Sequence, residues 1–245
     1  MYDELKLDHI LKTIAALQRR ISERFPDSGL SHVAGELYRV GEDLAPTLER
    51  LRRPRWALRA GLAVAILVIA ALLALFTLRF GRISVDVSGI GALLQAIEAA
   101  AQDLIFLSLA TYFLLTIENR LRRRASLRAL HRLRVIVHIV DMHQLTKDPE
   151  HLYAPEMRTP SSPARGLSRF QLSRYLDYCS ELLSLASKLA ALHVQYLNDP
   201  VVLEAVTDIE NLAGSLSSKI WQKIVILDAA RPAHAVAGAI PGQDV

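Results

Sequence analysis

Cysteine is almost absent from this chain of 245 residues, in which Cys179 stands alone. A single cysteine excludes an internal disulfide and any metal site built from several cysteines. Glycine and proline are also scarce, at 11 and 10 residues, while alanine and leucine are abundant, which favours helix throughout. The chain lacks a G-x-S-x-G elbow, a phosphate-binding loop, a dinucleotide fingerprint and an H-E-x-x-H motif. We therefore expect an all-α protein with no cofactor, and an enzymatic activity has no support.

Charged residues are missing from the 19 positions from Ala60 to Leu78, which are nearly all apolar. At a rise of about 1.5 Å per residue, such a helix matches a hydrocarbon core about 30 Å thick. A second apolar stretch follows after a short connection and is interrupted only by Glu98 and Asp103. The sequence therefore predicts an integral membrane hairpin of two helices. The hairpin domain and its two spans are residues 56–119, 58–79 and 97–118.

Arginine gathers on both flanks of the predicted hairpin and is rare in its connection. Positively charged residues next to a span stay in the cytoplasm and can pair with anionic lipid headgroups. We therefore expect a multi-pass protein of a bacterial inner membrane with both termini in the cytoplasm. The clusters carry no motif that reads nucleic acid, so no nucleic-acid partner is expected. The arginines with this role are Arg52, Arg53, Arg55, Arg122, Arg123 and Arg124.

Amphipathic helices flank the hairpin on both sides. Near the N-terminus, Ile10, Ile14, Leu17 and Ile21 follow the spacing of three and four residues that marks one helical face. Each such face needs a partner, which predicts an antiparallel bundle in the cytoplasm and permits a homo-oligomer or a protein partner. Before the last helix, Asp199 fits an N-cap. The predicted regions are N-terminal helices in 1–55, C-terminal helices in 120–232 with a proline-rich loop at 148–165, and a disordered tail at 233–245.

Carboxylate and amide side chains interrupt the second predicted span. On a helix, Gln95, Glu98 and Gln102 fall on one stripe and Asp103 lies beside it. Because a charge within a bilayer is costly and often functional, one interpretation is a polar seam lining a pore or proton path in an oligomer. The other interpretation is that the span begins near Glu98, which places Asp103 about one turn inside the bilayer.

Histidine and aspartate gather after the second predicted span. Such residues can bind divalent metals, and the candidate ligands are His138, Asp141, His143 and His193. No histidine pair among them has the i, i+4 spacing of a helical zinc site. The alternative is that these residues are polar groups at the surface or between helices. His193 falls within an apolar stripe and is expected to be a hydrogen-bonded histidine of the core.

Two short stretches, His143–Pro149 and Lys219–Ile224, resemble segments of uncharacterised bacterial inner-membrane proteins with two spans. The resemblance extends over most of the chain and implies no function. The order of helix, membrane hairpin and helix also resembles the pore subunit of the mitochondrial calcium uniporter. The acidic Trp-Asp-x-x-Glu motif of that pore is missing here, so no property of that family is carried over.

The sequence leaves three functions open. The leading hypothesis is a membrane-anchored cytoplasmic helical bundle that acts as a non-enzymatic interaction, scaffold or regulatory protein. The alternative is a small homo-oligomeric ion channel or transporter subunit that uses the polar face of the second span. A third is a metal-dependent membrane enzyme that uses the candidate ligands named above.

Overall fold

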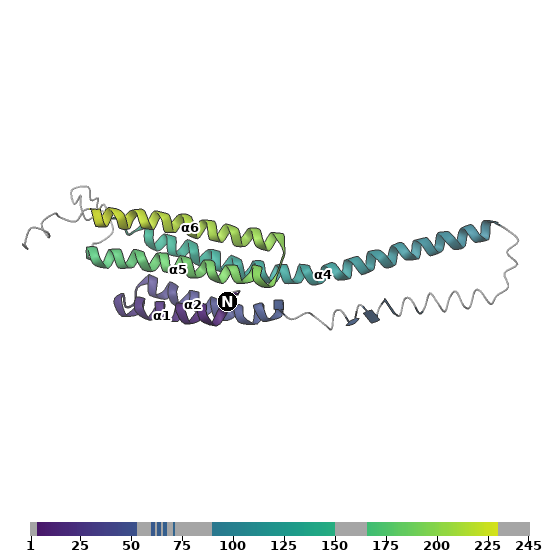
Figure 1. The fold of residues 1–245 in the computed structure, drawn as a ribbon, viewed down its shortest axis with the longest axis horizontal. Helices are drawn as coiled ribbons and strands as arrows, with labels where there is room; N and C mark the ends of the chain where they lie inside the picture. Colours follow the sequence, from purple (N-terminus) through teal and green to yellow (C-terminus); the bar gives the residue numbers. More distant parts are fainter. Residues whose placement is uncertain are drawn as a thin grey trace, which may run out of the picture. The chain divides into compact units, whose positions relative to one another are not determined.

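The computed structural model describes residues 4–52, 90–149 and 166–229, and seven single positions between 60 and 71. All regular secondary structure in these residues is helical, which confirms the predicted all-α class. By their contacts the residues divide into one unit of Met1–Leu48 with Ser126–Val245 and a second unit of Glu49–Ala125. The helices (Figure 1) are α1 (Leu7–Arg24), α2 (Gly29–Arg52), α4 (Ile90–Leu145), α5 (Arg169–Tyr196) and α6 (Pro200–Ala229).

Helices α1 and α2 form an antiparallel hairpin. The face of α1 predicted from the sequence is the one that is buried: Ile10, Ile14, Leu17 and Ile21. The chain turns through Asp27, whose φ of 54° lies in the left-handed region that aspartate tolerates better than most residues. Next to the turn, the hydroxyls of Ser22 and Ser31 lie 2.8 Å apart. The apolar faces of α1 and α2 therefore lie side by side from the turn onward.

Farther from the turn, a glycine lets α2 approach its neighbours closely. A Cβ added at Gly41 would lie 2.7 Å from Leu11 Cδ2 on α1 and 3.5 Å from Leu189 Cδ1 on α5. The missing side chain therefore leaves the space that these two leucines occupy. At this level of the bundle, α1, α2 and α5 share one packed layer.

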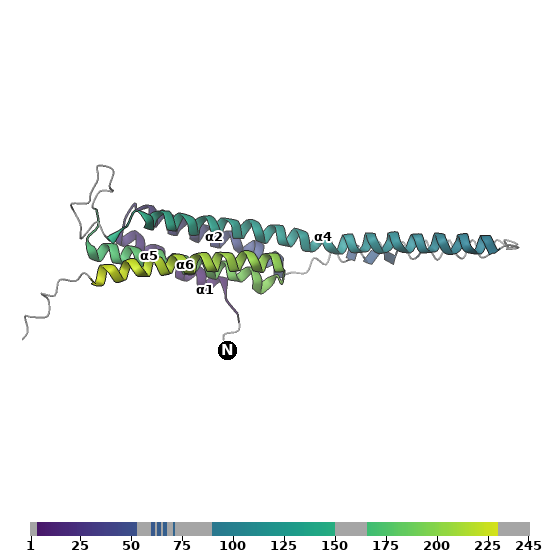
Figure 2. The same ribbon diagram turned by 90° about the horizontal axis from the view of Figure 1, so that it is seen from above.

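Helix α5 is the centre of the first unit. Its buried side chains occupy most of its circumference, which is expected of a helix that is packed on several sides. Figures 1 and 2 both show α5 lying beside α6, and the guanidinium of Arg169 donates to the carbonyl oxygen of Leu227. The start of α5 thus lies beside the end of α6, so the two helices are antiparallel.

Helix α1 also runs antiparallel to α5. Arg20, near the end of α1, pairs with Glu181 at 2.8 Å, whereas Leu5, just before α1, donates its backbone N–H to Gln195 Oε1 at 3.1 Å. The two contacts join opposite ends of the helices. Because α1 and α6 are both antiparallel to α5, they run parallel to each other along it.

The last part of α4 completes the bundle. Arg132 pairs with Asp43 of α2 at 2.7 Å, and the ring of His143 fills the space beside Gly29 at the start of α2. These two contacts make α4 antiparallel to α2. On α6, Lys223 Nζ donates to the backbone carbonyl of Gln144 at 3.0 Å and so satisfies a carbonyl group at the end of α4. The helical bundle expected from the sequence is therefore present.

The structure contradicts the predicted membrane location. In the part of the chain that the structure describes, no helix combines the length and the apolar character needed to cross a membrane. The multi-pass inner-membrane protein is contradicted, and the two-span hairpin is unsupported. Most of the first predicted span, 58–79, lies outside the described residues. The second, 97–118, forms part of α4, where the longest uncharged run is the 14 residues from Leu104 to Ile117. That run is about 21 Å long, against a hydrocarbon core of about 30 Å.

The start of α6 is capped as the sequence predicts. Asp199 is buried, and its Oδ1 accepts hydrogen bonds from the backbone N–H groups of Val201 at 3.0 Å and Val202 at 3.2 Å. Replacing Asp199 with alanine leaves these donors without that acceptor, so we expect the free energy of unfolding to fall by about 1–2 kcal/mol. Urea denaturation measures the change. Asp199→Asn keeps an acceptor oxygen and should lose less than half as much; an equal loss would show that the cap is not the cause.

Candidate functional site

One face of α5 is not covered by the other helices that the structure describes. Between Asp177 and Ala191, the side chains of α5 that are not buried recur every three or four residues, so they form one stripe. Most are small, including Ser180, Ser184 and Ser187. This stripe is the floor of a groove.

Helices α1 and α6 form the two walls of this groove. One part of it has a volume of about 650 Å³ and is lined by His9, Ile10 and Thr13 of α1 and by Ile220, Trp221 and Ile224 of α6. A second hollow of about 430 Å³ continues along α5 toward its C-terminus, where Ala213 and Gly214 of α6 form the wall. Ser184, Lys188 and Ser217 line both hollows, so the groove is continuous. We call these two parts the Trp221 hollow and the Gly214 hollow.

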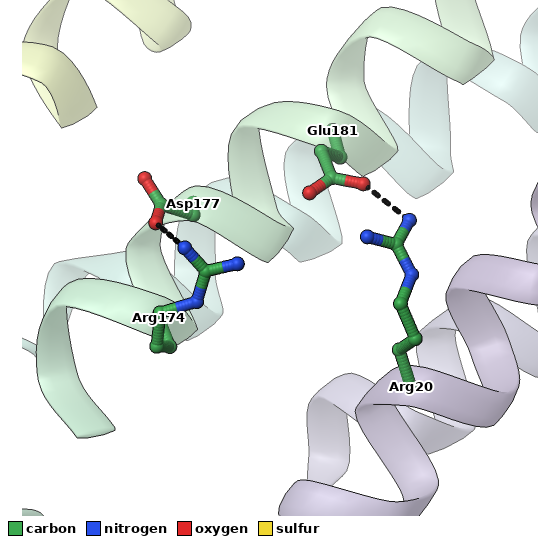
Figure 3. A network of polar contacts seen from close by, with 4 residues as sticks. All are labelled: Arg20, Arg174, Asp177 and Glu181. Atoms are coloured by element: carbon green, nitrogen blue, oxygen red, sulfur yellow. Dashed lines mark hydrogen bonds and ion pairs between the residues drawn. The ribbon is translucent and has the colours of Figure 1, made fainter. Parts of the chain in front are cut away.

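Charged side chains stand at the Trp221 end of the groove. Figure 3 shows Arg174 and Asp177 within α5, joined at 3.0 Å, and Arg20 of α1 reaching Glu181 of α5 at 2.8 Å. All four are partly exposed, so each pair contributes little to stability, about 0–1 kcal/mol. The main effect of the two ion pairs is on the surface of the groove, because they hold both carboxylates at its α5 side.

Aromatic rings underneath these pairs fix the end of the bundle. The ring of Phe25 meets those of Tyr175 and Tyr178 edge to face, with centroids 5.4 and 6.3 Å away. The guanidinium groups of Arg20 and Arg174 lie 5.9 and 5.6 Å from the centre of the Tyr178 ring. Cations at this distance are attracted to an aromatic face. The same two arginines therefore bind their carboxylates and pack on a buried ring, which limits their movement.

Two side chains of types that can take part in catalysis are enclosed in the core instead of facing the groove. Burial raises the pKa of the Cys179 thiol to about 12, so the thiolate needed for nucleophilic chemistry does not form at neutral pH. Burial lowers the pKa of His193 to about 4, so its imidazole is neutral. Neither ring nitrogen of His193 has a hydrogen-bond partner among the described residues. The prediction of a core histidine is confirmed, but the expected hydrogen bond is not found.

The candidate metal ligands do not come together. His138 is exposed, Asp141 accepts a hydrogen bond from Gln144 Nε2 at 2.7 Å, and His193 is enclosed in the core. Burial, followed by the positive charge of Lys147, lowers the pKa of His143, which packs beside α2. Across residues 4–52, 90–149 and 166–229, no three histidine, cysteine or acidic side chains are grouped so that they could hold a metal ion.

Of the other predicted site residues, none that the structure describes is among those that line the two hollows. Glu98 and Gln102 are exposed on α4, while the side chains of Gln95 and Asp103 lie outside the described set, as do Arg53, Arg55 and the side chain of Arg52. Arg122 and Arg123 are half-buried and Arg124 is exposed, and each of the three has an interaction partner. Only the first two residues of the predicted loop at 148–165 are described, and the tail at 233–245 lies outside the described residues.

The groove residues were not identified from the sequence. Ser184 and Lys188 read as an ordinary solvated face of an amphipathic helix, and nothing in the sequence shows that α1 and α6 flank that face. Trp221 carried the one available signal, because it stands among polar residues on α6 rather than on the apolar stripe of Ile220 and Ile224. In the structure its side chain is 65% exposed. A large aromatic residue so exposed is typical of a binding surface.

Comparison with protein-family models, with curated proteins and with solved structures finds no match for this chain. The resemblance to bacterial two-span proteins therefore gains no support from known proteins.

Proposed function

We propose that the helical bundle is a non-enzymatic interaction module that binds an α-helix in the groove along α5. The observation that supports this function is the uncovered stripe of α5, with small side chains at its floor and α1 and α6 as its walls. Amphipathic helices bind grooves of this kind through residues spaced by three and four. Helix axes that pack together lie about 8–10 Å apart, and small floor residues permit this approach.

The buried chemistry of the bundle also favours binding over catalysis. The Cys179 thiol and the His193 ring are shielded from any substrate in the groove. The groove itself presents paired charges, hydroxyls and one exposed aromatic side chain, which are typical of a recognition surface. Recognition by this surface requires no chemical step.

Photo-cross-linking from the groove tests the proposal in the full chain. Lys188 lines both hollows and is exposed, so a diazirine-bearing lysine analogue placed there should capture whatever occupies the groove. The matched control places the same analogue at Lys219, which is exposed on α6 but does not line the groove. We expect a cross-linked protein from Lys188 and none from Lys219. Equal cross-linking from the two positions would contradict the proposal.

Filling the groove gives an independent check. Ser184→Arg places a long side chain on the floor, while the position is exposed, so the fold should persist with unchanged helicity by circular dichroism. Cross-linking from Lys188 should then fall at least tenfold. If it stays at the level of the unmodified floor, the occupant does not lie in the groove.

A further inference from the structure

We infer that the part of α4 before Ser126 pairs antiparallel with the same part of α4 in a second copy of this chain, with the pairing centred on Leu109. The inference goes beyond the proposed function, because it concerns a different surface from the groove. It is carried by an exposed apolar face of α4 and by two charged residues placed symmetrically on the same side of the helix.

Five large apolar side chains lie on one side of α4 and are exposed. At about 100° per residue, all of them fall within about 60° of the direction of Leu109. Each is between 58% and 69% exposed, and three are aromatic. An exposed apolar surface of this extent is typical of contact with a partner. The five are Ile105, Phe106, Leu109, Tyr112 and Phe113, and we call them the α4 apolar face.

This side of α4 is symmetric in sequence about Leu109. Ile105 and Phe113 lie four residues before and after it, and Gln102 and Thr116 lie seven residues before and after it. Steps of four and seven residues return to nearly the same side of a helix, so these positions follow one line. In an antiparallel pair centred on Leu109, Ile105 of one copy lies opposite Phe113 of the other. The amide of Gln102 likewise lies opposite the hydroxyl of Thr116.

Two charged residues extend the same symmetry. Glu98 lies eleven residues before Leu109 and Arg120 lies eleven residues after it, and eleven residues make about three turns. Both side chains are exposed, and neither has an ion-pair partner within residues 4–52, 90–149 and 166–229. In the antiparallel pair, Glu98 of each copy lies opposite Arg120 of the other. A parallel pair would place like charges together, so the charges favour the antiparallel arrangement.

The remaining charges of this part of α4 do not oppose the pairing. The three arginines at 122–124 each have an interaction partner within the chain, and the positions opposite them, 94–96, carry no charge. Steps of six and nine residues from Leu109 place Asp103 and Glu118 away from the line. The pairing therefore brings no like charges together along the line.

The size of the α4 apolar face fits an interface between two copies. The three aromatic rings on each copy are about three-fifths exposed. Because an aromatic side chain can bury about 150–250 Å², the six rings of a pair can supply roughly 500–900 Å². The leucine and isoleucine side chains add to this area. The total approaches the range in which stable protein interfaces begin, about 1,200 Å².

Cysteine cross-linking of the full chain tests the axis. The native Cys179 is fully buried, so a new surface cysteine is the one that reacts. Two copies of Leu109→Cys should lie next to each other and form an intermolecular disulfide on mild oxidation. The matched control is Gln102→Cys, which is exposed on the same line. Its two copies lie about 21 Å apart in the antiparallel pair but would meet in a parallel one. We expect most of the first variant and little of the second to run as a covalent dimer, and equal yields would overturn the inference.

Charge reversal tests the pairing of Glu98 with Arg120. By sedimentation, Glu98→Arg should weaken the dimer about tenfold, because two attractions become two repulsions, and Arg120→Glu should do the same. The double variant restores both pairs with their signs exchanged, so its dissociation constant should return to within about threefold of that of the unmodified chain. Both positions are exposed, so the helicity should not change. A double variant that dimerises no more tightly than the single variants would contradict the inference.

The Ser184→Arg variant separates this inference from the proposed function. Filling the groove should abolish cross-linking from Lys188 and leave the dimer unchanged, so each result can fail without the other. A full chain that sediments as a monomer, with no disulfide from Leu109→Cys, overturns the self-association and leaves the groove function standing. The α4 apolar face would then belong to lipid or to another protein, and flotation with lipid vesicles distinguishes these two partners.

Discussion

Acidification from pH 6.5 to pH 4 should lower the free energy of unfolding by about 3 kcal/mol through His193 alone. The side chain of His193 is fully buried in α5, and burial lowers its pKa to about 4. In the unfolded chain the same group has a pKa of about 6.5. Between these two pKa values the unfolded state binds a proton and the folded state does not. The contribution of neutral His193 to the free energy of unfolding is therefore fully present above pH 6.5 and is lost as the pH falls through 4.

Two substitutions at His193 separate its titration from its polarity. His193→Leu removes both the titration and an imidazole whose nitrogens have no partner among the described residues. We expect it to raise the free energy of unfolding at pH 7 by about 1–3 kcal/mol and to remove the acid-dependent loss. His193→Gln should remove the acid-dependent loss without the gain at pH 7. Urea denaturation at several pH values measures both effects.

The acid-dependent loss of stability in the wild-type chain is the reference for these comparisons. All three proteins have the same carboxylates, so the difference between wild type and each variant isolates the contribution of His193. A His193→Leu variant that is less stable than wild type at pH 7 would contradict the account. That outcome would mean that the imidazole makes a favourable polar contact within the core.

Truncation of Leu189 should cost about 3 kcal/mol, within the usual range of 2–5 kcal/mol for a buried leucine. Leu189 is fully buried and lies where α1, α2 and α5 meet, next to the position that a Cβ of Gly41 would take. Leu189→Ala opens a cavity in that layer, and rigid helices on three sides limit its collapse. Thermal and urea denaturation measure the loss.

The double variant tests whether the cavity lies where the structure places it. In the Leu189→Ala background, Gly41→Ala adds a methyl group that points toward the vacated space, and Leu11 gains room to move aside. Part of the lost stability should return, whereas Gly41→Ala alone should be neutral or destabilising. Ser184→Ala, on the exposed face of α5, is the control and should change stability by less than about 0.5 kcal/mol. Additive effects of Leu189→Ala and Gly41→Ala would contradict this packing.

Local features of the fold could be predicted from the sequence because they depend on neighbours along the chain. The spacing of Ile10, Ile14 and Leu17 identifies the buried face of α1, and Asp199 before Pro200 identifies the start of α6. Both follow from helix geometry and from the unsatisfied N–H groups of a first turn. No tertiary information is needed for either.

The membrane location and the groove could not be derived in the same way. The apolar run after Asp103 suggested a span, but an apolar composition alone does not establish a helix long and apolar enough to cross a bilayer. The groove depends on which helices flank α5, and those contacts join residues far apart in the sequence, such as Arg20 and Glu181. A polar stripe on α5 has the same sequence pattern whether it faces open solvent or a binding groove.

The first unit is assembled from two separate pieces of chain, and this discontinuity sets an order of folding during synthesis. Residues Met1–Leu48 must wait for Ser126 and beyond, because α5, which packs against α1, ends only at Tyr196. At about 5–20 residues per second, the interval from Arg52 to Tyr196 lasts roughly 7–29 s. Until the end of α4 is made, the apolar faces of α1 and α2 have only each other as cover, and α1 must then wait for α5. The nascent α1–α2 hairpin is therefore the stage of biogenesis most exposed to aggregation and to capture by chaperones.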